Sequence, residues 1–280
     1  MLVAMDPVES SYYVHAIDPV LIQLWGPFAV RWYGLAYVAG FALAYAQLIR
    51  WARSDWFRIS VEEVQTLIVF AIFGVMLGGR LGYLFFYDFP AWRTDPALLF
   101  RVWEGGMASH GGLLGLTLAM YLFARVKRVP FLHVADAMVC AGSIGIFFGR
   151  IANFINGELW GRVTDVRWAV IFPQAAEWSP ALGQWVAYPR HPSQLYGAVL
   201  EGLLVWGILQ GLRKTAWARQ RDGRLGVAFL VLYAVGRISA EFFREPEILY
   251  FGWLTQGQLL SALMFVPAIW VGWFLHRPRA

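Results

Sequence analysis

Residues 64–86 read VQTLIVFAIFGVMLGGRLGYLFF, and Arg80 is the only charged side chain among them. A helix needs roughly 20 mostly apolar residues to cross the ~30 Å hydrocarbon core of a bilayer. This stretch therefore predicts a membrane-spanning helix and decides the class of the protein. Six other stretches meet the same criterion approximately. The seven predicted spans are 28–49, 64–86, 107–124, 134–155, 193–212, 226–243 and 257–275.

The composition of the whole chain indicates that lipid surrounds it. Of its 280 residues, 59% are hydrophobic and 15% are charged, whereas soluble domains are about 45–50% apolar and about 25% charged. The chain also holds 15 Trp, 12 Tyr and 21 Phe, and aromatic rings are enriched at membrane interfaces. Because the sequence shows no internal repeat or low-complexity linker, we expect one all-α membrane domain over residues 1–280. We also expect the protein to act as a monomer.

Basic residues outside the spans predict the orientation of the chain. Cytoplasmic loops carry an excess of Lys and Arg, and the segments after the first, third, fifth and seventh spans hold thirteen of them, against five on the other side. The N-terminus is therefore expected outside the cytoplasm and the C-terminus inside it. This clustering also accounts for the net charge of +5 without a nucleic-acid partner. Residues 157–191 are too long for a simple connection and predict a small extracytoplasmic cap.

Polar residues in and beside the spans are the candidates for function. A charged side chain inside a bilayer costs roughly 2.5–3.5 kcal/mol, so each one needs an explanation. The predicted orientation brings most of them to the outer ends of the helices, namely Arg31, Tyr33, Arg80, His110, Arg150, His191, Gln194, Tyr196, Arg237, Glu241 and Arg244. Several guanidinium groups at one depth repel each other unless an anion is present, and their planar donors match phosphate oxygens. A phospholipid headgroup is the expected anion.

The alternative is that these arginines are structural. Each could extend its side chain to the interface or pair internally, as Arg237 could with Glu241 at i, i+4. Asn153 shares a helix face with Arg150 and could donate to phosphate or simply join helices. Glu201 lies mid-span, where we expect it to pair or to stay protonated.

His110 is a candidate proton acceptor. Glycines flank it at positions 105, 106, 111 and 112, and glycine allows backbone and ligand to approach closely. Its imidazole titrates near neutrality. A hydrogen-bonded structural histidine is the alternative. The single cysteine, Cys140, is interpreted as a small buried side chain.

One stretch resembles a known family. Residues 149–162 read GRIANFINGELWGR, which is similar to the signature of bacterial prolipoprotein diacylglyceryl transferases. Further segments resemble the same family, namely RWYG at 31–34, GGRLG at 78–82, WEGGM at 103–107 followed by HGG at 110–112, RHPSQLY at 190–196 and GRISAEFFR at 236–244. The family's usual Ser-Phe-His is Ala108-Ser109-His110 here, so the packing role of that Phe has no counterpart. The resemblance covers roughly residues 25–275.

The resemblance implies an activity. The family transfers the diacylglyceryl group of phosphatidylglycerol to the lipobox cysteine thiol in the signal peptide of a preprolipoprotein, and it releases glycerol 1-phosphate at the bacterial inner membrane. It implies no metal and no other cofactor. The catalytic positions that it implies are His110, Arg150, Tyr233, Arg237 and Glu241. The implied phosphatidylglycerol-binding positions are Tyr33, Asn153, Glu158, Gly161 and again Arg150 and Arg237, to which we add Arg80.

These assignments suggest a mechanism as a hypothesis. Arg150 and Arg237 would stabilise the departing phosphate. His110 would be the base or an orienting group for the substrate thiol, whose unperturbed pKa is about 8.5. A transporter or scramblase for anionic lipid, which should show polar residues reaching the inner leaflet, and a structural partner in a secretion assembly are the other classes. The resemblance favours the enzyme.

Overall fold

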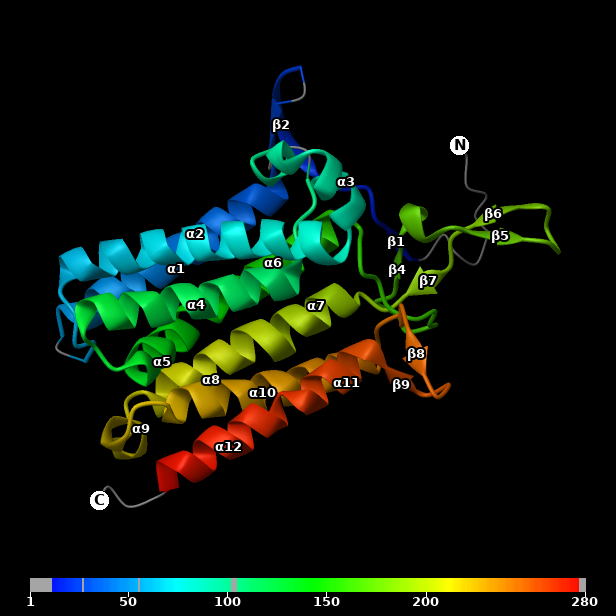
Figure 1. Cartoon of the computed structure of the whole chain (residues 1–280). Coiled ribbons are helices and arrows are strands. Elements are labelled where there is room, and N and C mark those ends of the chain that lie inside the picture. Colours follow the sequence, from blue (N-terminus) through cyan, green and yellow to red (C-terminus); the bar gives the residue numbers. More distant parts are fainter. Residues whose placement is uncertain (1–11, 27, 55, 102–104, 277–280) are drawn as a thin grey trace. The chain divides into compact units, whose positions relative to one another are not determined.

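The protein is mostly helical (Figure 1). The computed structural model describes residues 12–26, 28–54, 56–101 and 105–276, so Trp103 and Glu104 of the family-like motif lie outside the described residues. The α-helices are α1 (Trp32–Ala52), α2 (Val61–Phe86), α3 (Phe89–Thr94), α4 (Ser109–Lys127), α5 (Phe131–Gly142), α6 (Ile144–Ile155), α7 (Ser193–Gly197), α8 (Leu204–Leu212), α9 (Ala216–Gln220), α10 (Arg224–Glu241), α11 (Gln256–Leu263) and α12 (Phe265–His276).

Short elements of other kinds join these helices. Two 3-10 helices are η2 (Pro96–Leu99) and η4 (Pro173–Ala175), and η5 (Ala198–Leu203) is a π-helix between α7 and α8. The strands are β1 (Tyr13–Val14), β2 (Val20–Trp25), β3 (Phe28–Arg31), β4 (Val170–Ile171), β5 (Glu177–Ser179), β6 (Gln184–Val186), β7 (Pro189–Arg190), β8 (Leu249–Tyr250) and β9 (Leu254–Thr255).

Five helical segments of the described chain are long and apolar enough to cross a membrane. They are 32–52, 61–86, 131–155, 193–212 and 256–276. The prediction of a helical, multi-pass membrane protein is confirmed at this level. The other two predicted spans are helical as α4 and α10, but they carry more polar residues, among them His110, Arg237 and Glu241. The count of seven spans and their orientation stay predictions.

The first predicted span begins later than expected. Residues 28–31 form β3, which pairs antiparallel with β2, and the helix starts only at Trp32. The prediction of a span from residue 28 is therefore wrong at its start. The reason is that an apolar run has no fixed period, so its first residues fit a hairpin as well as a helix.

By its internal contacts the chain divides into two compact units. The first unit comprises residues 1–44 and 139–280, and the second comprises residues 45–138. Helices α1 and α5 pass from one unit into the other. The single-domain interpretation stays a prediction.

In the second unit, α2 and α4 pack closely along a row of glycines. A Cβ atom on Gly78 would lie 2.7 Å from the Cα of Gly115, and one on Gly82 would lie 2.8 Å from the Cα of Gly111. Small residues at four-residue spacing let helix backbones approach in this way. Gly111, beside His110, thus has a packing role that its sequence neighbourhood did not reveal.

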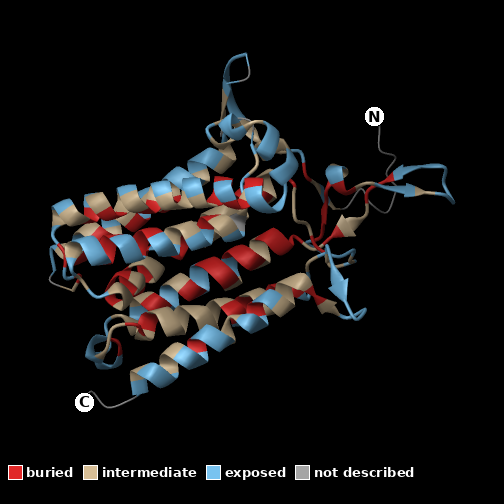
Figure 2. Ribbon diagram, viewed as in Figure 1, coloured by how far each residue is buried: buried red, intermediate tan, exposed pale blue. Residues whose placement is uncertain are grey.

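In the first unit, α10 packs against η5, α11 and α12, and η5 also packs against α6 (Figure 1). Glycines again allow the close approach, because a Cβ on Gly202 would lie 2.6 Å from the Cα of Phe147 and one on Gly236 would lie 2.6 Å from the carbonyl oxygen of Leu200. Many residues of α7 and η5 are buried (Figure 2). This buried segment holds Glu201, which is 1% exposed.

Residues 157–191, the predicted cap, fold as short strands and turns of the first unit. Strand β4 pairs antiparallel with β7 and parallel with β1, which comes from the N-terminal segment. Strands β5 and β6 form a separate hairpin. The core under this sheet contains Val170, Phe172 and Ala175, with Phe154 and Trp160 packed against them. Strand β1 therefore adds a part to the cap that the sequence did not predict.

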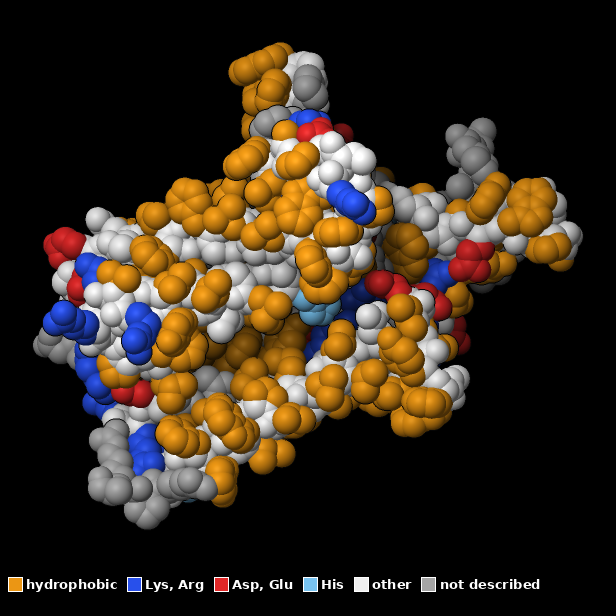
Figure 3. Space-filling view, viewed as in Figure 1, with side chains coloured by type: hydrophobic (Ala, Val, Ile, Leu, Met, Phe, Trp, Pro, Cys, Tyr) orange, Lys and Arg blue, Asp and Glu red, His pale blue; other side chains and the backbone are white. Residues whose placement is uncertain are grey.

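Large apolar side chains cover the outer surfaces of the helices (Figure 3). On α12, for example, Val266, Ile269 and Trp270 are each more than 60% exposed. A soluble monomer rarely exposes apolar patches of this extent. The surface agrees with helices that face hydrocarbon.

Candidate functional site

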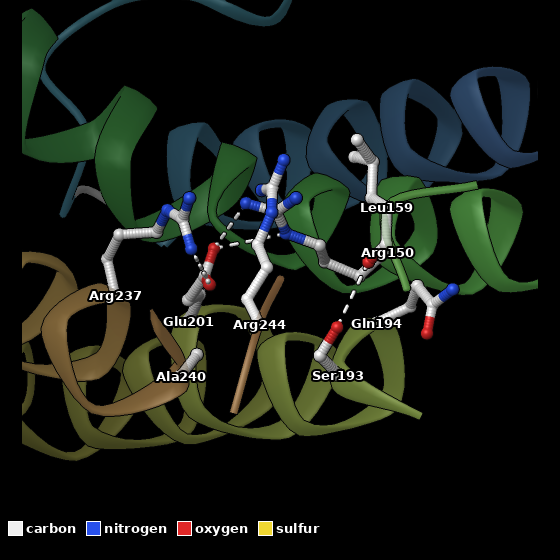
Figure 4. A pocket seen from close by; sticks show the side chains of 8 residues that line it. All are labelled: Arg150, Leu159, Ser193, Gln194, Glu201, Arg237, Ala240 and Arg244. Atoms are coloured by element: carbon white, nitrogen blue, oxygen red, sulfur yellow. Dashed lines mark hydrogen bonds and ion pairs between the residues drawn. The ribbon is translucent and has the colours of Figure 1, made fainter. Parts of the chain in front are cut away.

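A buried carboxylate joins two of the predicted site arginines in the first unit. Arg150 on α6 donates from Nε and Nη2 to Oε2 of Glu201, over 3.1 and 2.7 Å. Arg237 on α10 lies with its Nη1 3.7 Å from Oε1 of the same carboxylate. Figure 4 shows both guanidinium groups directed at Glu201 from different helices. The structure thus brings Arg150 and Arg237 together, as the sequence predicted, through a residue that was not included in the predicted site.

The expected i, i+4 pair on α10 is also present. Arg237 forms an ion pair with Glu241, whose side chain is 5% exposed. Gly257 on α11 leaves room for this carboxylate, because a Cβ there would lie 2.6 Å from the Glu241 carboxylate oxygens. The pair that the i, i+4 spacing allows is therefore present. Arg237 is therefore held between two carboxylates.

Arg150, Arg237 and Glu201 line a pocket (Figure 4). Arg244, which follows α10, adds a third guanidinium and also binds the exposed Glu247 over 2.6 Å. The lining residues are Arg150, Leu159, Ser193, Gln194, Glu201, Arg237, Ala240 and Arg244. Within the cluster of Arg150, Arg237, Arg244, Glu201 and Glu241, three cations face two anions. The formal charge of this cluster is +1, which suits one anionic ligand.

Tyr233 is part of the same cluster. It lies one turn before Arg237 on α10 and interacts electrostatically with the side chain of Arg150. The tyrosine therefore connects the two helices that supply the arginines. This contact is compatible with the catalytic position that the family resemblance implies, and its role in the reaction stays a prediction.

Asn153 and Glu158 form a second polar group next to Arg150 in the sequence. The amide Nδ2 of Asn153 donates to Oε1 of Glu158 over 2.8 Å, and Asn156 donates to the same oxygen over 3.4 Å. The Tyr33 side chain on α1 interacts with Asn153 and Glu158. Glu158 is thus oriented by two amides, and its backbone carbonyl accepts a 2.7 Å bond from Nε2 of Gln194. Direct lipid contacts of these residues stay predictions.

Gly161 has a packing role that explains why it is glycine. A Cβ there would lie 2.5 Å from the carbonyl oxygens of both His191 and Phe243. Its amide donates to His191 over 2.9 Å, and its carbonyl accepts from the buried Arg190 over 3.2 Å. Arg190 also binds Glu245 over 3.1 Å. Gly161 therefore allows the cap to pack closely against the end of α10. This position favours a structural role for Gly161 over phosphatidylglycerol binding.

His191 lies at the edge of this region among aromatic side chains. Its ring packs against Phe243 and Tyr196, with centroids 5.2 and 5.8 Å away. The hydroxyl of Tyr196 lies 3.2 Å from Nδ1 of His191 and accepts a 2.7 Å bond from Trp168. Partial burial lowers the pKa of His191 below 6.5. The imidazole is therefore neutral near pH 7.

Arg80 belongs to the second unit and has a different environment. Its side chain donates to the backbone carbonyls of Leu98, Gly105 and Gly106 and, over 3.0 Å, of Arg101. The residue is only 3% exposed. Its donors are used to fix the segment before α4, which favours a structural role, and headgroup binding by Arg80 stays a prediction.

His110 is also in the second unit. It is the second residue of α4 and its side chain is exposed. An exposed imidazole at a helix start is accessible to a substrate, and its role as base stays a prediction. Among the described residues there is no group of three His, Cys, Asp or Glu side chains suited to a metal ion.

Glu201 is the functional candidate that sequence reasoning left out of the site. The signal was available, because a carboxylate in the middle of an apolar span requires a partner. The sequence could not show that one carboxylate serves two arginines from separate helices. Ser193 joins the pocket too, and its hydroxyl donates to the carbonyl of Leu159 over 3.0 Å.

Comparison with known proteins gives a consistent answer. A family model described as prolipoprotein diacylglyceryl transferase matches residues 19–274. Similar curated proteins carry the name phosphatidylglycerol-prolipoprotein diacylglyceryl transferase. That of Allorhizobium ampelinum is 43% identical over 98% of this chain and 96% of its own length. Those of Idiomarina loihiensis and Methylococcus capsulatus are 44% and 45% identical over 95% and 91% of this chain, and 94% of each relative is covered.

Proposed function

The chain belongs to the prolipoprotein diacylglyceryl transferase family, and we propose on this basis that it carries out the first step of bacterial lipoprotein maturation. It transfers the diacylglyceryl group of phosphatidylglycerol to the lipobox cysteine of a preprolipoprotein. The thiol sulfur attacks the glyceryl carbon, a thioether C–S bond forms, and the C–O bond to phosphate breaks. The thiol loses its proton, and glycerol 1-phosphate leaves with the electron pair of the broken bond.

The observation that carries the proposal at the site is the convergence of Arg150 and Arg237 at one pocket. Negative charge grows on the phosphate as the C–O bond breaks, and donors that are already in place stabilise it without reorganisation. A guanidinium offers five donors, and Glu201 takes two from Arg150. Donors remain for the phosphate oxygens.

The other site residues have supporting roles in this proposal. Glu241 fixes Arg237 by its ion pair, and Tyr233 contacts Arg150. Asn153, Glu158 and Tyr33 bind the glycerol end of the headgroup through their hydrogen-bonding groups. His110 takes the thiol proton or orients the thiol. None of these steps uses Cys140, because the reacting thiol belongs to the substrate.

The membrane arrangement completes the proposal. The chain crosses the bacterial inner membrane seven times, with α4 and α10 as the two more polar spans, its N-terminus outside and its C-terminus in the cytoplasm. The pocket opens toward the outer leaflet, where phosphatidylglycerol and the signal peptide meet. The enzyme acts as a monomer. The excess of Lys and Arg in the segments assigned to the cytoplasm supports this orientation.

The experiment is transfer by the purified protein. Vesicles of phosphatidylglycerol and a lipobox peptide should give a peptide whose mass rises by one diacylglyceryl group, together with free glycerol 1-phosphate. A peptide with serine in place of cysteine and vesicles of phosphatidylethanolamine are the controls. Folded protein that leaves the cysteine peptide unmodified would refute the activity and favour a lipid transporter or an assembly partner.

A further inference from the structure

The π-helix η5 places Glu201 where three helical segments meet. Both α6 and α10 pack against η5, and Glu201 is 1% exposed. A π-helical turn inside an α-helix is rare and is frequent at functional sites. The carboxylate oxygens are divided between the two arginines, Oε2 toward Arg150 and Oε1 toward Arg237.

This division fixes both guanidinium groups at once. Arg150 meets Glu201 with two donors, and a two-donor contact sets the orientation of the planar group. Without a negative charge between them, Arg150 and Arg237 would repel each other at close range in a medium of low polarity. Glu201 also lowers the formal charge of the five-residue cluster from +2 to +1. A glutamine there would keep the shape and lose both effects.

The backbone around Glu201 is fitted to this arrangement. Gly197 lies one turn before Glu201, and a Cβ on it would lie 3.1 Å from Oε1 of Glu201 and 3.3 Å from Nε of Arg150. Gly236 on α10 faces the backbone of Leu200 and Glu201 in the same close manner. The ion pair therefore occupies space that any larger residue at 197 would restrict.

We propose that Glu201 is a positioning residue, which rests on the proposed function. It holds Arg150 and Arg237 in the geometry that receives the phosphate, and it sets the charge of the pocket to suit the single negative charge of a phosphodiester. The phosphomonoester product carries nearly two negative charges at neutral pH. The same carboxylate therefore weakens the retention of the product and helps it to leave.

The test combines turnover with product inhibition. For Glu201→Gln we expect kcat to fall about 100-fold, because the arginines lose their fixed geometry, and inhibition by glycerol 1-phosphate to become about tenfold tighter, because the pocket gains a positive charge. Glu201→Asp should recover part of both values. Glu247→Gln is the matched control, since Glu247 also pairs with an arginine of the pocket but is 67% exposed; it should behave as wild type.

Each outcome decides the proposal. A kcat for Glu201→Gln within threefold of the wild-type value would overturn the proposal. Product inhibition that becomes weaker while kcat falls would also overturn it, because loss of a merely structural glutamate would weaken both turnover and product binding.

If Glu201→Gln does not fold, Gly197→Ala replaces it. Alanine suits a helix, and its Cβ would crowd the Glu201–Arg150 pair, so kcat should fall about tenfold with the folded yield unchanged, and an unchanged kcat would contradict the proposal. Inactive wild-type protein would refute the proposed function itself.

Discussion

Both units of the protein hold arginines that are buried or half-buried, and the partners of these arginines differ. Arg80 in the second unit donates only to backbone carbonyls in the contacts described above. Arg150 and Arg237 in the first unit are paired with carboxylates. The carbonyl groups around Arg80 do not neutralise its charge, but their hydrogen bonds fix the segment before α4. The carboxylates around Arg150 and Arg237 neutralise part of the arginine charge and leave a defined net charge in the pocket. The same residue type in an apolar span therefore indicates either architecture or chemistry, and its partners distinguish the two.

The largest expected effect is at the carboxylate-paired arginines. Arg150→Lys or Arg237→Lys should lower transfer at least 100-fold, because lysine offers a point charge in place of a planar, two-donor contact. The measurement is turnover in reconstituted phosphatidylglycerol vesicles, with folding checked by thermal unfolding. Near-normal turnover in both variants would show that Arg150 and Arg237 do not bind the phosphate. The contrast between these arginines and the structural Arg80 would then not hold.

Arg80→Lys should affect stability more than turnover. Lysine has fewer donors than arginine, so some of these carbonyls lose their hydrogen bond from residue 80, at a cost of about 1–3 kcal/mol for each bond to the charged group. We expect a lower unfolding temperature, and a KM for phosphatidylglycerol within threefold of wild type. An unchanged unfolding temperature with a tenfold higher KM would show instead that Arg80 binds the headgroup.

The glycines of the second unit provide a smaller test of its architectural role. A Cβ on Gly115 would lie 2.8 Å from the Cα of Gly78, whereas one on Gly112 would be in ordinary contact, 3.5 Å from the carbonyl oxygen of Val75. Gly115→Ala should therefore destabilise the α2–α4 pair by about 1–3 kcal/mol. Gly112→Ala is the matched control and should unfold like wild type. Equal behaviour of the two would argue against close packing of α2 on α4.

The smallest expected effect is a pH dependence in the first unit. His15 follows β1 and packs against Phe154 and Phe172, with ring centroids 5.3 and 5.4 Å away. Burial lowers the pKa of His15 below 6.5, so the unfolded chain binds the proton more readily. Its contribution to stability is therefore complete above about pH 6.5 and is lost as the pH falls below that value, by at most about 1.4 kcal/mol per pH unit.

Protease resistance of the N-terminal segment at pH 7.5 and pH 5.5 measures this effect. His15→Leu keeps an apolar side chain without a titrating group, so its resistance should differ less between the two values than that of wild type. An equal loss of resistance in both proteins would assign the pH dependence to other groups, such as His191.

Local features of the site could be predicted from the sequence. The spacing of Arg237 and Glu241 predicts a pair on one helical face, and the structure contains it. The apolar runs predict helices, and all seven predicted segments are helical over most of their length. These features depend on residues close together in the chain, where helical geometry alone decides which side chains meet.

Other features could not be predicted because they depend on which segments pack together. Strand β1 pairs with β4 more than 150 positions away in the sequence. The role of Arg80 depends on carbonyl groups of residues 98–106, which lie 18 or more positions away in the sequence. Gly111 lies against the backbone of α2, and Gly161 lies against the backbone of His191 and Phe243, so neither position has room for a side chain. These neighbours are distant in the sequence and could not be predicted from the residues around each glycine.

The sequence alone determined that this chain is a helical membrane protein with arginines that need anions, since hydrophobicity, charge and helical spacing are properties of the residues themselves. The tertiary structure decided which arginines have a carboxylate as partner and which have carbonyl groups. Glu201 meets Arg150 and Arg237 because η5 packs against both α6 and α10. The interaction energy of an ion pair depends on the distance between the two charges in space, whatever their separation along the chain.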